Sequence, residues 1–384
     1  MVKKIALLGS TGSIGRQALE VIEELGPGYR VVALAAGSND RLLAEQIRRF
    51  RPELAALNDH EAAARLTGPV KGIPCKIEAG KEGQIKAATW ETADLVVMAQ
   101  VGFSGFEPLV AALERGKAVA LSNKESLVIG GEILQNMGLL DREKIIPVDS
   151  EHSAIWQCLE KGRQGQVARV FLTASGGPFF GYRKEELEKV TVDEALRHPN
   201  WQMGKKITVD SATMMNKGLE VIEARWLFGF ELDQIEVVIH RQSIVHSMVE
   251  YIDGSIIAQL GLPDMRLPIQ YALTYPERSM NRFEKFSPFD RTLTFERPDR
   301  SNFPCLDLAY RAAEVGGTMP AVLNGANEVA VAGFIDGKIN FTAIAKVIES
   351  AMGQHKTIHN PGIGDILDAD SWSRQKAIEI IDGL

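Results

Sequence analysis

The strongest indication of the fold lies close to the N-terminus, in the stretch Ile5-Ala6-Leu7-Leu8-Gly9-Ser10-Thr11-Gly12-Ser13-Ile14-Gly15. Its first four residues form an apolar run typical of a buried strand, and a helical pattern continues from the glycines to Leu25. In such a turn, Gly9 permits a tight bend, Gly12 lets the backbone approach a pyrophosphate, and Gly15 lets the helix close on the sheet. Free N–H groups at the helix start would face the anion. We therefore predict a dinucleotide site, with a purely structural turn as the alternative.

Short apolar runs and helical patterns alternate over the first 149 residues. We expect further strands at 31–35, 95–99, 118–121 and 145–148. Strands that alternate with helices form a parallel sheet covered by helices. The sequence therefore predicts an α/β fold, with a Rossmann-like domain over residues 1–149.

The pattern changes after residue 149. Apolar runs there predict strands at 169–174, 235–240, 243–251 and 255–260, the last two joined by a turn at Asp253-Gly254. We expect a central α+β domain over 150–274 and a proline-rich connecting segment over 275–304. Apolar residues three and four positions apart then predict a C-terminal helical bundle over 305–384. Its helices are expected around 306–315, 321–334, 341–352 and 371–381.

The composition of the 384 residues excludes several classes of protein. With 45% hydrophobic and 24% charged residues, the chain is typical of a globular protein of more than one domain. The net charge of −7 and the scattered basic residues argue against a nucleic-acid partner, and no apolar run approaches the roughly 20 residues of a membrane span. The N-terminus enters a strand without a signal sequence, and three widely spaced cysteines fit neither a zinc site nor a disulfide framework. We therefore expect a cytoplasmic protein.

The end of the second expected strand bears on the choice of cofactor. The sequence Gly37-Ser38-Asn39 offers no Asp or Glu to bind the ribose hydroxyls of NAD, which favours NADP. Ser38, Asn39 and Arg41 together could bind a 2′-phosphate. A helix N-cap followed by a solvated arginine is the alternative.

Two polar clusters follow later strands, at the edge of the sheet where such folds bind ligands. Asn123-Lys124-Glu125 follows the strand at 118–121, and Lys124 could be catalytic or face a substrate. The alternative is a helix cap with a surface ion pair. Asp149 and Glu151 follow the next strand and could bind Mg²⁺ or Mn²⁺, or could cap a helix over 153–159.

The most informative stretch of the central domain is Asp210-Ser211-Ala212-Thr213-Met214-Met215-Asn216-Lys217-Gly218-Leu219-Glu220. We expect Ser211 to start a helix on which Asn216, Lys217 and Glu220 share one face. Lys217 and Asn216 suit a phosphate, and Glu220 suits a third metal ligand. A Lys–Glu pair on a wet helix surface is the alternative.

Two loops of the central domain complete the candidate site. Ser175-Gly176-Gly177 ends a strand in a glycine-rich turn whose hydroxyl and N–H groups could contact an anion. The stretch 198–205 is polar but contains Trp201 and Met203, which have little reason to face water permanently. We predict that it is a lid, with a docked structural loop as the alternative.

The chain closely resembles the 1-deoxy-D-xylulose 5-phosphate reductoisomerase family in eight motifs, which occur in order over nearly its whole length. They are GSTGSIG, SNKESLV, PVDSEHSAI, TASGGPF, HPNWQMG, DSATMMNKGLE, QLGLPDMR and NGANE. The resemblance implies a homodimer whose subunit has an NADPH domain, a catalytic domain with a flexible flap, and a C-terminal helical domain.

The resemblance also implies roles for individual residues. The metal ligands would be Asp149, Glu151 and Glu220, which with Lys124 form the catalytic set. The residues that contact the substrate and its phosphate would be Lys124, Ser150, Glu151, Ser175, His198, Ser211, Asn216, Lys217 and Glu220. The residues that contact NADPH would be Thr11, Gly12, Ser13, Ile14, Gly37, Ser38, Asn39, Asn123, Glu125 and Gly204.

The implied activity is the isomerisation and reduction of 1-deoxy-D-xylulose 5-phosphate to 2-C-methyl-D-erythritol 4-phosphate, in the non-mevalonate isoprenoid pathway. It would need NADPH and one divalent cation, Mg²⁺ or Mn²⁺. A sugar-phosphate dehydrogenase without the rearrangement is one alternative, against which the third carboxylate Glu220 argues. A non-catalytic NADPH sensor is another, although it would have no use for a metal triad, a lid and a phosphate site together.

Two residues depart from the pattern of the family. Ser38 stands where many relatives have Lys or Arg, which leaves a 2′-phosphate with one cation fewer. Arg241 stands where relatives commonly have Pro, and we expect its effect to be local to a strand connection near His246.

Overall fold

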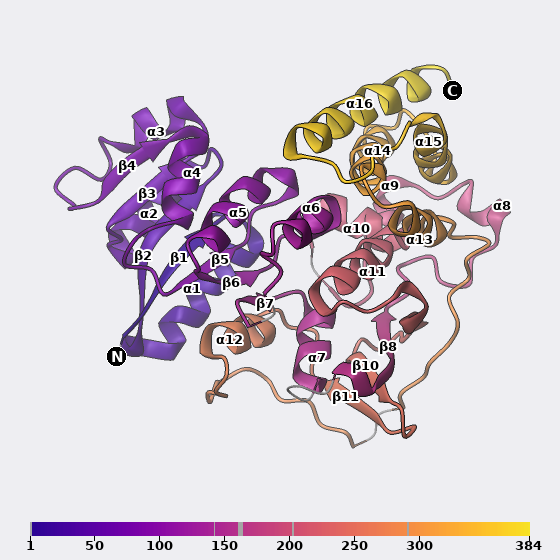
Figure 1. The fold of residues 1–384 in the computed structure, drawn as a ribbon, viewed down its shortest axis with the longest axis horizontal. Coiled ribbons are helices and arrows are strands. Elements are labelled where there is room, and N and C mark those ends of the chain that lie inside the picture. Colours follow the sequence, from indigo (N-terminus) through magenta and orange to yellow (C-terminus); the bar gives the residue numbers. More distant parts are fainter. Residues whose placement is uncertain (1, 142, 160–163, 202, 290–291) are drawn as a thin grey trace. The chain divides into compact units, whose positions relative to one another are not determined.

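The computed structural model describes residues 2–141, 143–159, 164–201, 203–289 and 292–384. The chain forms two compact units that are interleaved along the sequence. The first comprises Met1–Ser126, Gly138–Ser153 and Asp264–Glu284. The second comprises Leu127–Met137, Ala154–Pro263 and Lys285–Leu384. Figure 1 labels the elements of both units.

A parallel sheet of seven strands forms the centre of the first unit, as the sequence predicted. Its strands are β1 (Lys3–Leu8), β2 (Tyr29–Ala36), β3 (Leu54–Leu57), β4 (Lys76–Ala79), β5 (Leu95–Met98), β6 (Ala118–Leu121) and β7 (Ile145–Pro147). They lie in the order β4-β3-β2-β1-β5-β6-β7. The chain moves outward from β1 to β4 and then returns to β5 beside β1, so the loops after β1 and β5 flank the switch point where such sheets bind ligands.

Helices connect and cover these strands. They are α1 (Ser13–Leu25), α2 (Asp40–Phe50), α3 (His60–Leu66), α4 (Gly80–Ala88), α5 (Phe106–Glu114) and, from later in the chain, α12 (Arg266–Thr274). Ile269, Ala272 and Leu273 of α12 pack in the same core as Ile5 of β1. The Nζ of Lys3 also donates a hydrogen bond of 2.7 Å to the carbonyl of Leu273. These contacts fix the segment 264–284 to the first unit.

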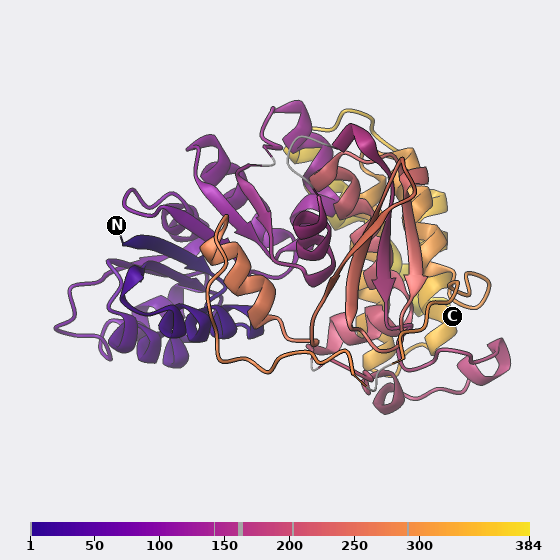
Figure 2. The same ribbon diagram turned by 90° about the horizontal axis from the view of Figure 1, so that it is seen from below.

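The second unit contains a mixed sheet of four strands, β8 (Val167–Ala174), β9 (Ile235–Ile239), β10 (Val245–Tyr251) and β11 (Ile256–Leu260). Their order is β11-β10-β8-β9, and they run side by side in Figure 2. β10 pairs antiparallel with β8 and β11, whereas β8 and β9 are parallel. The predicted turn at Asp253-Gly254 joins β10 to β11, with the Ser255 N–H bonded to Asp253 Oδ1 at 2.9 Å.

The second unit also contains helices. They are α8 (Lys184–Leu187), α9 (Val192–Ala195), α10 (Lys205–Ala212), α11 (Met215–Phe228), α13 (Cys305–Val315), α14 (Met319–Ile335), α15 (Phe341–Gln354) and α16 (Ile363–Asp382). The elements α6 (Lys124–Asn136) and α7 (Ser150–Cys158) each begin in the first unit and continue into the second. Within the ranges described, no helix has both the length and the apolar character of a membrane span.

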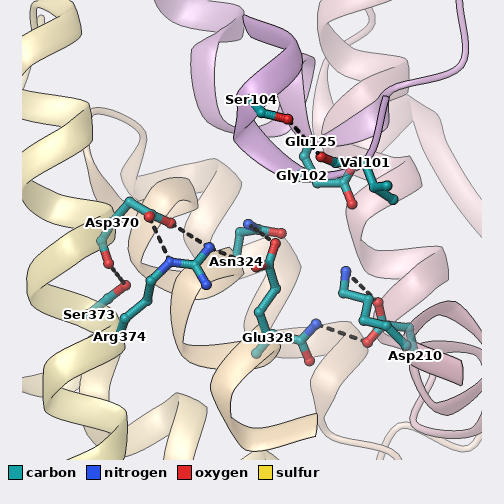
Figure 3. A network of polar contacts seen from close by, with 12 residues as sticks. Val101, Gly102, Ser104, Glu125, Asp210, Asn324, Glu328, Asp370, Ser373 and Arg374 are labelled. Carbon is teal, nitrogen blue, oxygen red and sulfur yellow. Dashed lines mark hydrogen bonds and ion pairs between the residues drawn. The ribbon is translucent and has the colours of Figure 1, made fainter. Parts of the chain in front are cut away.

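The predicted C-terminal helices are confirmed, but α16 begins well before residue 371. Its first two turns bury Ile366 and Ala369, and Asp365 accepts a hydrogen bond of 2.8 Å from the N–H of Gly362 at the helix start. Arg374 fixes the helix by pairing with Glu328 of α14 and with Asp370, each at 2.7 Å, as Figure 3 shows. The helical pattern of 363–370 is obscured because aspartates interrupt its apolar residues.

Candidate active site

The glycine turn after β1 has the predicted strand–turn–helix geometry. Gly9 has a φ of +82°, and a Cβ there would lie 2.3 Å from the carbonyl oxygen of Ala99. A Cβ at Gly15 would lie 2.2 Å from the carbonyl oxygen of Gly9, so α1 touches the turn through its backbone. Gly12 is the N-cap of α1 and provides no side-chain cap, which leaves the N–H groups of the first turn to other acceptors. This geometry fits a pyrophosphate.

A residue that we did not predict supports this turn. Gln46 of α2 is buried, and its amide donates to the carbonyl of Ser10 at 2.8 Å. Ser10 in turn donates its hydroxyl hydrogen to Gln46 Oε1 at 2.7 Å. The pair ties α2 to the loop between β1 and α1. A polar residue on the buried face of a predicted helix was the only sequence signal for it.

Gly15→Ala is expected to weaken dinucleotide binding at least about tenfold. The added methyl group has no space against Gly9, and overpacking of this kind costs about 1–3 kcal/mol, which here would displace the helix start from the anion. Fluorescence titration with NADPH measures the dissociation constant. Gly28→Ala is the control, because a Cβ at Gly28 meets nothing within 4 Å. Equal affinity of the two variants would show that the turn is purely structural.

The loop after β2 contains the helix cap that we considered as an alternative. Asn39 is the N-cap of α2, and its Oδ1 accepts a hydrogen bond of 3.1 Å from the N–H of Leu42. Ser38 and Arg41 are exposed. Asp40, the nearest acid, pairs with Arg65 at 2.9 Å, and the hydrogen bond from Arg65 lowers the pKa of Asp40. The loop therefore presents polar groups and an exposed arginine, whose role in cofactor binding stays a prediction.

We expect the protein to bind NADPH more tightly than NADH, and Ser38→Asp to weaken NADPH binding at least about tenfold. A carboxylate at this position would repel a 2′-phosphate and accept hydrogen bonds from a ribose diol instead, and a tenfold change needs only about 1.4 kcal/mol. The ratio of the two dissociation constants, measured by titration, checks this. Tighter NADH binding in the unmodified protein would exclude a phosphate site at Ser38 and Arg41.

Lys124, the first residue of α6, forms a buried ion pair. The ion pair on the protein surface that we considered as an alternative is therefore excluded. The Nζ of Lys124 lies 2.9 Å from Oδ2 of Asp149, and the two side chains are only 9% and 11% exposed. The pair joins the end of β6 to the end of β7. The preceding Asn123 is also buried, donates to the carbonyls of Gln100 and Gly102 at 2.9 Å, and accepts from the N–H of Ser126. The helix cap is therefore real, but the cation points to a carboxylate inside the protein.

The acidic cluster after β7 lies at the start of α7, which begins at Ser150 and not at residue 153. The carbonyl of Asp149 accepts from the N–H of Ser153, so the helical bonding begins three residues earlier than we expected. Ser150 donates to Glu151 Oε2 at 2.6 Å, and Nδ1 of the buried His152 lies 3.7 Å from Oδ1 of Asp149. One oxygen of Asp149 and one of Glu151 lie within 4.8 Å of each other, a donor pair that suits a hard cation.

The ionisation of Asp149 follows from its neighbours. Burial by itself would raise the pKa of this carboxyl, but the positive charge of Lys124 and the contact with His152 hold the pKa well below its ordinary value. Asp149 is therefore a carboxylate over the whole physiological range of pH. An ionised carboxylate is a ligand that Mg²⁺ and Mn²⁺ prefer.

The stretch that contains Ser211 forms two helices instead of one. Ser211 lies in the last turn of α10, and α11 begins at Met215. Met214, between them, has a φ of +66°, which ends one helix and redirects the chain before the next. Our placement of Ser211 at a helix start was therefore wrong, because such a backbone conformation at a methionine leaves no signal in the sequence.

Asn216, Lys217 and Glu220 share one face of α11, as predicted. The Asn216 amide donates to Glu220 Oε1 at 2.6 Å, and Lys217 Nζ contacts Glu220 Oε2. The Lys217 and Glu220 side chains are only 5% and 1% exposed, which excludes a pair on a wet surface. A charged cluster this deeply buried is costly unless a ligand or a partner uses it.

Ser175 and His198, which the sequence suggested separately, lie together in the second unit. The Ser175 Oγ is 3.0 Å from His198 Nε2 and accepts a hydrogen bond of 3.1 Å from the N–H of Gly177. The Nδ1 of His198 accepts from the N–H groups of Asn200 and Trp201, at 3.2 and 2.9 Å. The neutral ring must therefore carry its hydrogen on Nε2 and donate it to Ser175. The Ser175 hydroxyl then has its own hydrogen to donate to an anion.

The structure describes the loop 198–205 except for Gln202. In the described part, the loop contacts the connection between β9 and β10. The ring of Trp201, half-buried, lies 6.2 Å from that of His246. The Asn200 amide donates to the carbonyl of Arg241 and to Ser243 Oγ, both at 2.7 Å. Arg241 reaches the turn at Ser175 and Gly177, so our expectation that its effect would be local was wrong.

Asp210, which we did not single out, fixes the helix that bears Ser211. It is buried, its Oδ1 accepts a hydrogen bond of 2.9 Å from the amide of Asn327 in α14, and its Oδ2 pairs with Lys206 at 2.8 Å. Figure 3 shows Asp210 beside α14 and the Glu328–Arg374 pair. One indication of this contact was present in the sequence: Asp210 belongs to the motif DSATMMNKGLE and Asn327 to the motif NGANE, although 117 positions separate the two residues.

The candidate residues divide between the two units. The first unit contains the proposed NADPH contacts other than Gly204, together with Lys124, Asp149, Ser150 and Glu151. The second unit contains Ser175, His198, Gly204, Ser211, Asn216, Lys217 and Glu220. Within the first unit Lys124 pairs with Asp149, and within the second Ser175 contacts His198 and Glu220 contacts Asn216 and Lys217.

Comparison with known proteins gives one family throughout. The family model described as 1-deoxy-D-xylulose 5-phosphate reductoisomerase matches residues 5–131, the model of its C-terminal domain matches 145–228, and a model described as DXP reductoisomerase C-terminal domain matches 260–376. Proteins of that name from Pelotomaculum thermopropionicum and Caldanaerobacter subterraneus are 55% and 54% identical to this chain, over 99% and 98% of both sequences.

Solved structures give the same result. The chain is similar to the enzyme of that name from Zymomonas mobilis in complex with NADPH, with a TM-score of 0.93 and 40% identity over 100% of both chains. A DOX-P reductoisomerase in complex with NADPH, fosmidomycin and magnesium gives a TM-score of 0.92 at 39% identity, covering 99% of this chain and 98% of that one. Since relatives more than half identical match almost its whole length, the chain belongs to the 1-deoxy-D-xylulose 5-phosphate reductoisomerase family.

Proposed function

We propose that this protein converts 1-deoxy-D-xylulose 5-phosphate to 2-C-methyl-D-erythritol 4-phosphate with NADPH and a divalent cation, in the non-mevalonate isoprenoid pathway. The observation that carries the proposal is the full-length match at 55% identity to a protein of that activity. The relative solved with NADPH, fosmidomycin and magnesium supports the choice of cofactors. NADPH oxidation with this substrate, measured with and without a chelator, tests it: no oxidation in the presence of Mg²⁺ or Mn²⁺ would reject the proposal.

The NADPH site is proposed to lie along the edge of the first sheet. The N–H groups at the start of α1 would bind the pyrophosphate through Thr11, Gly12, Ser13 and Ile14, and Gly37, Ser38 and Asn39 would contact the adenosine end. Asn123, Glu125 and Gly204 are the remaining proposed contacts. The tight packing at Gly9 and Gly15 supports this assignment, because a Cβ at either position would collide with backbone atoms and force the start of α1 away from the turn.

The cation is proposed to bind to Asp149, Glu151 and Glu220. Three carboxylates are the hard oxygen donors that Mg²⁺ and Mn²⁺ prefer, and both cations remain candidates. When bound, the cation would polarise the substrate's carbonyl oxygen and stabilise developing negative charge. Until then, Lys124 balances the charge of Asp149, and Lys217 balances that of Glu220.

The substrate is proposed to be held at both ends by residues of this chain. Ser175, His198, Ser211, Asn216 and Lys217 would bind the phosphate, to which Ser175 can donate its hydroxyl hydrogen. Lys124 and Ser150 would contact the reacting end. Binding energy from the phosphate then holds the reacting carbons in place.

The loop 198–205 is proposed to act as a lid over bound substrate. Trp201→Ala is expected to lower kcat/KM about tenfold or more, through lost positioning and exclusion of water, with little change in melting temperature. A permanently buried tryptophan would instead cost about 3–5 kcal/mol of stability. Hydrogen exchange with and without metal and fosmidomycin decides between the two. Strong protection before ligand is added, or no gain in protection afterwards, would contradict the lid.

The wider assignments are also proposals. Residues 1–149 would form the NADPH domain, 150–274 the catalytic domain, 275–304 the connection and 305–384 the helical domain. We further propose a homodimer in the cytoplasm, which acts on a small sugar phosphate without a nucleic-acid or membrane partner. A monomeric mass in sedimentation equilibrium would reject the dimer.

A further inference from the structure

Arg241 lies between β9 and β10, and its side chain connects this segment to the turn that follows β8, which is far away in the sequence. Its Nη1 donates to the carbonyl of Ser175 at 3.0 Å and to the carbonyl of Gly177 at 2.8 Å. The guanidinium also lies 4.9 Å from the centre of the Phe180 ring. Burial lowers the pKa of this arginine, but an arginine starts so high that it stays charged. A permanent cation is therefore fixed against the glycine-rich turn that follows β8.

The carbonyls that Arg241 holds control the conformation of that turn. Gly176 and Gly177 have φ values of +76° and +67°, and a Cβ at Gly177 would lie 2.8 Å from the carbonyl oxygen of Ser211. Because the peptide between Ser175 and Gly176 is trans, fixing its C=O toward Arg241 turns the Gly176 N–H away from it. The two hydrogen bonds from Arg241 thus hold the turn in a left-handed conformation, in which the Gly177 N–H donates to Ser175 Oγ and fixes that hydroxyl group.

The main chain of Arg241 holds the other side of the same anion site. Its carbonyl accepts from the amide of Asn200, which belongs to the loop of His198. The Asn200 N–H bonds to His198 Nδ1, and His198 Nε2 meets Ser175 Oγ. Arg241, Ser175, His198 and Asn200 therefore form a closed circuit of hydrogen bonds, in which Arg241 contributes both a side chain and a carbonyl.

We propose that Arg241 is a positioning residue for the phosphate end of the substrate. It orients Ser175 and His198, and its charge lowers the cost of bringing a phosphate dianion to the turn. The inference rests on the proposed function, because it takes Ser175 and His198 to be the phosphate contacts. Arg241 would act on Ser175 and His198 without itself touching the substrate.

Arg241→Met is the first test, because methionine keeps an extended apolar side chain but has neither donors nor charge. We expect KM for 1-deoxy-D-xylulose 5-phosphate to rise about tenfold, which is the effect of losing one charge-assisted interaction. We expect kcat to stay within about threefold and KM for NADPH to be unchanged, since only binding of the remote phosphate is altered. The inhibition constant of inorganic phosphate, used as a competitive probe, should rise in parallel with KM.

Two further variants separate positioning from a structural role. Arg241→Lys keeps the charge and a donor, so it is expected to restore most of the phosphate affinity. Arg183→Met is the matched control, since the Arg183 side chain is 78% exposed and pairs with Glu186 of α8, away from the turn at Ser175. It should leave KM and the melting temperature unchanged.

Each result decides the matter. Unchanged KM and phosphate inhibition in Arg241→Met would overturn the inference. So would losses of kcat and melting temperature that are equal in Arg241→Met and Arg241→Lys, because they would indicate a purely structural residue. If the unmodified protein does not turn over the substrate, the proposed function fails, and calorimetric titration of inorganic phosphate into both proteins still tests the inference: equal phosphate affinity would overturn it.

Discussion

Replacing Glu220 with glutamine is expected to lower kcat/KM for 1-deoxy-D-xylulose 5-phosphate by about a thousandfold, while the dissociation constant of NADPH changes less than about twofold. Glu220 is buried on α11 and supplies one of three proposed carboxylate ligands. Glutamine keeps the size and one oxygen but removes the charge that a divalent cation needs. A thousandfold loss corresponds to about 4 kcal/mol, within the stabilisation that a metal ion gives to developing charge.

The measurement is kcat/KM at saturating and at limiting Mg²⁺, together with an NADPH titration. Lys217 and Asn216 also contact Glu220, so the substitution could change stability as well as activity. The melting temperature of the variant must therefore be measured together with its kcat/KM. Glu185→Gln, at an exposed position on α8, is the control and should change nothing. Near-normal activity of Glu220→Gln at limiting Mg²⁺ would mean that Glu220 serves only as the partner of Lys217.

Lys124→Met is expected to lower kcat at least about a hundredfold and to destabilise the protein by about 3–5 kcal/mol. Breaking a buried pair leaves an unbalanced charge, here Asp149. Lys124 is also the proposed contact to the reacting oxygen, and losing such a donor costs two to three orders of magnitude in many enzymes. Urea unfolding and steady-state kinetics measure the two effects. Lys124→Arg keeps the charge and should retain most of the stability.

A matched control for Lys124 lies in the same unit. Lys81 pairs with Glu107 at 2.6 Å, but its side chain is 61% exposed, so Lys81→Met should cost less than about 1 kcal/mol. Equal destabilisation by Lys81→Met and Lys124→Met would show that burial of the Lys124–Asp149 pair does not govern its energy. Normal kcat in Lys124→Met would remove it from the catalytic set.

Much of the fold could be predicted because its strands are local apolar runs. The strand at 118–121 was predicted at its observed bounds, and the strands before the glycine turn and before Asp149 within a few residues. β3 and β4 were missed, since Leu54–Leu57 has no β-branched residue, unlike the strand at 118–121, and Lys76–Ala79 alternates polar and apolar residues over only four positions. So short an alternation does not identify a strand.

The sequence named candidate site residues one by one, but it did not predict most of the contacts between them. Spacing on one helix placed Asn216, Lys217 and Glu220 together, because a helix fixes neighbours three and four positions apart. No such rule relates Lys124 to Asp149, or Asp210 to Asn327, which meet only when separate elements pack. Burial is likewise a property of the packed chain, so sequence alone could not decide between a surface pair and a buried one.

The proposed activity requires one protein to rearrange a carbon skeleton and then reduce it, and the structure of the product shows whether both steps occur. The protein should be incubated with ¹³C-labelled 1-deoxy-D-xylulose 5-phosphate, NADPH and Mg²⁺, and the product examined by ¹³C NMR. We expect one branched product, 2-C-methyl-D-erythritol 4-phosphate, which forms in step with NADPH oxidation and is absent when a chelator is present. A linear reduced sugar phosphate, or oxidation that continues at full rate with the chelator present, would contradict it.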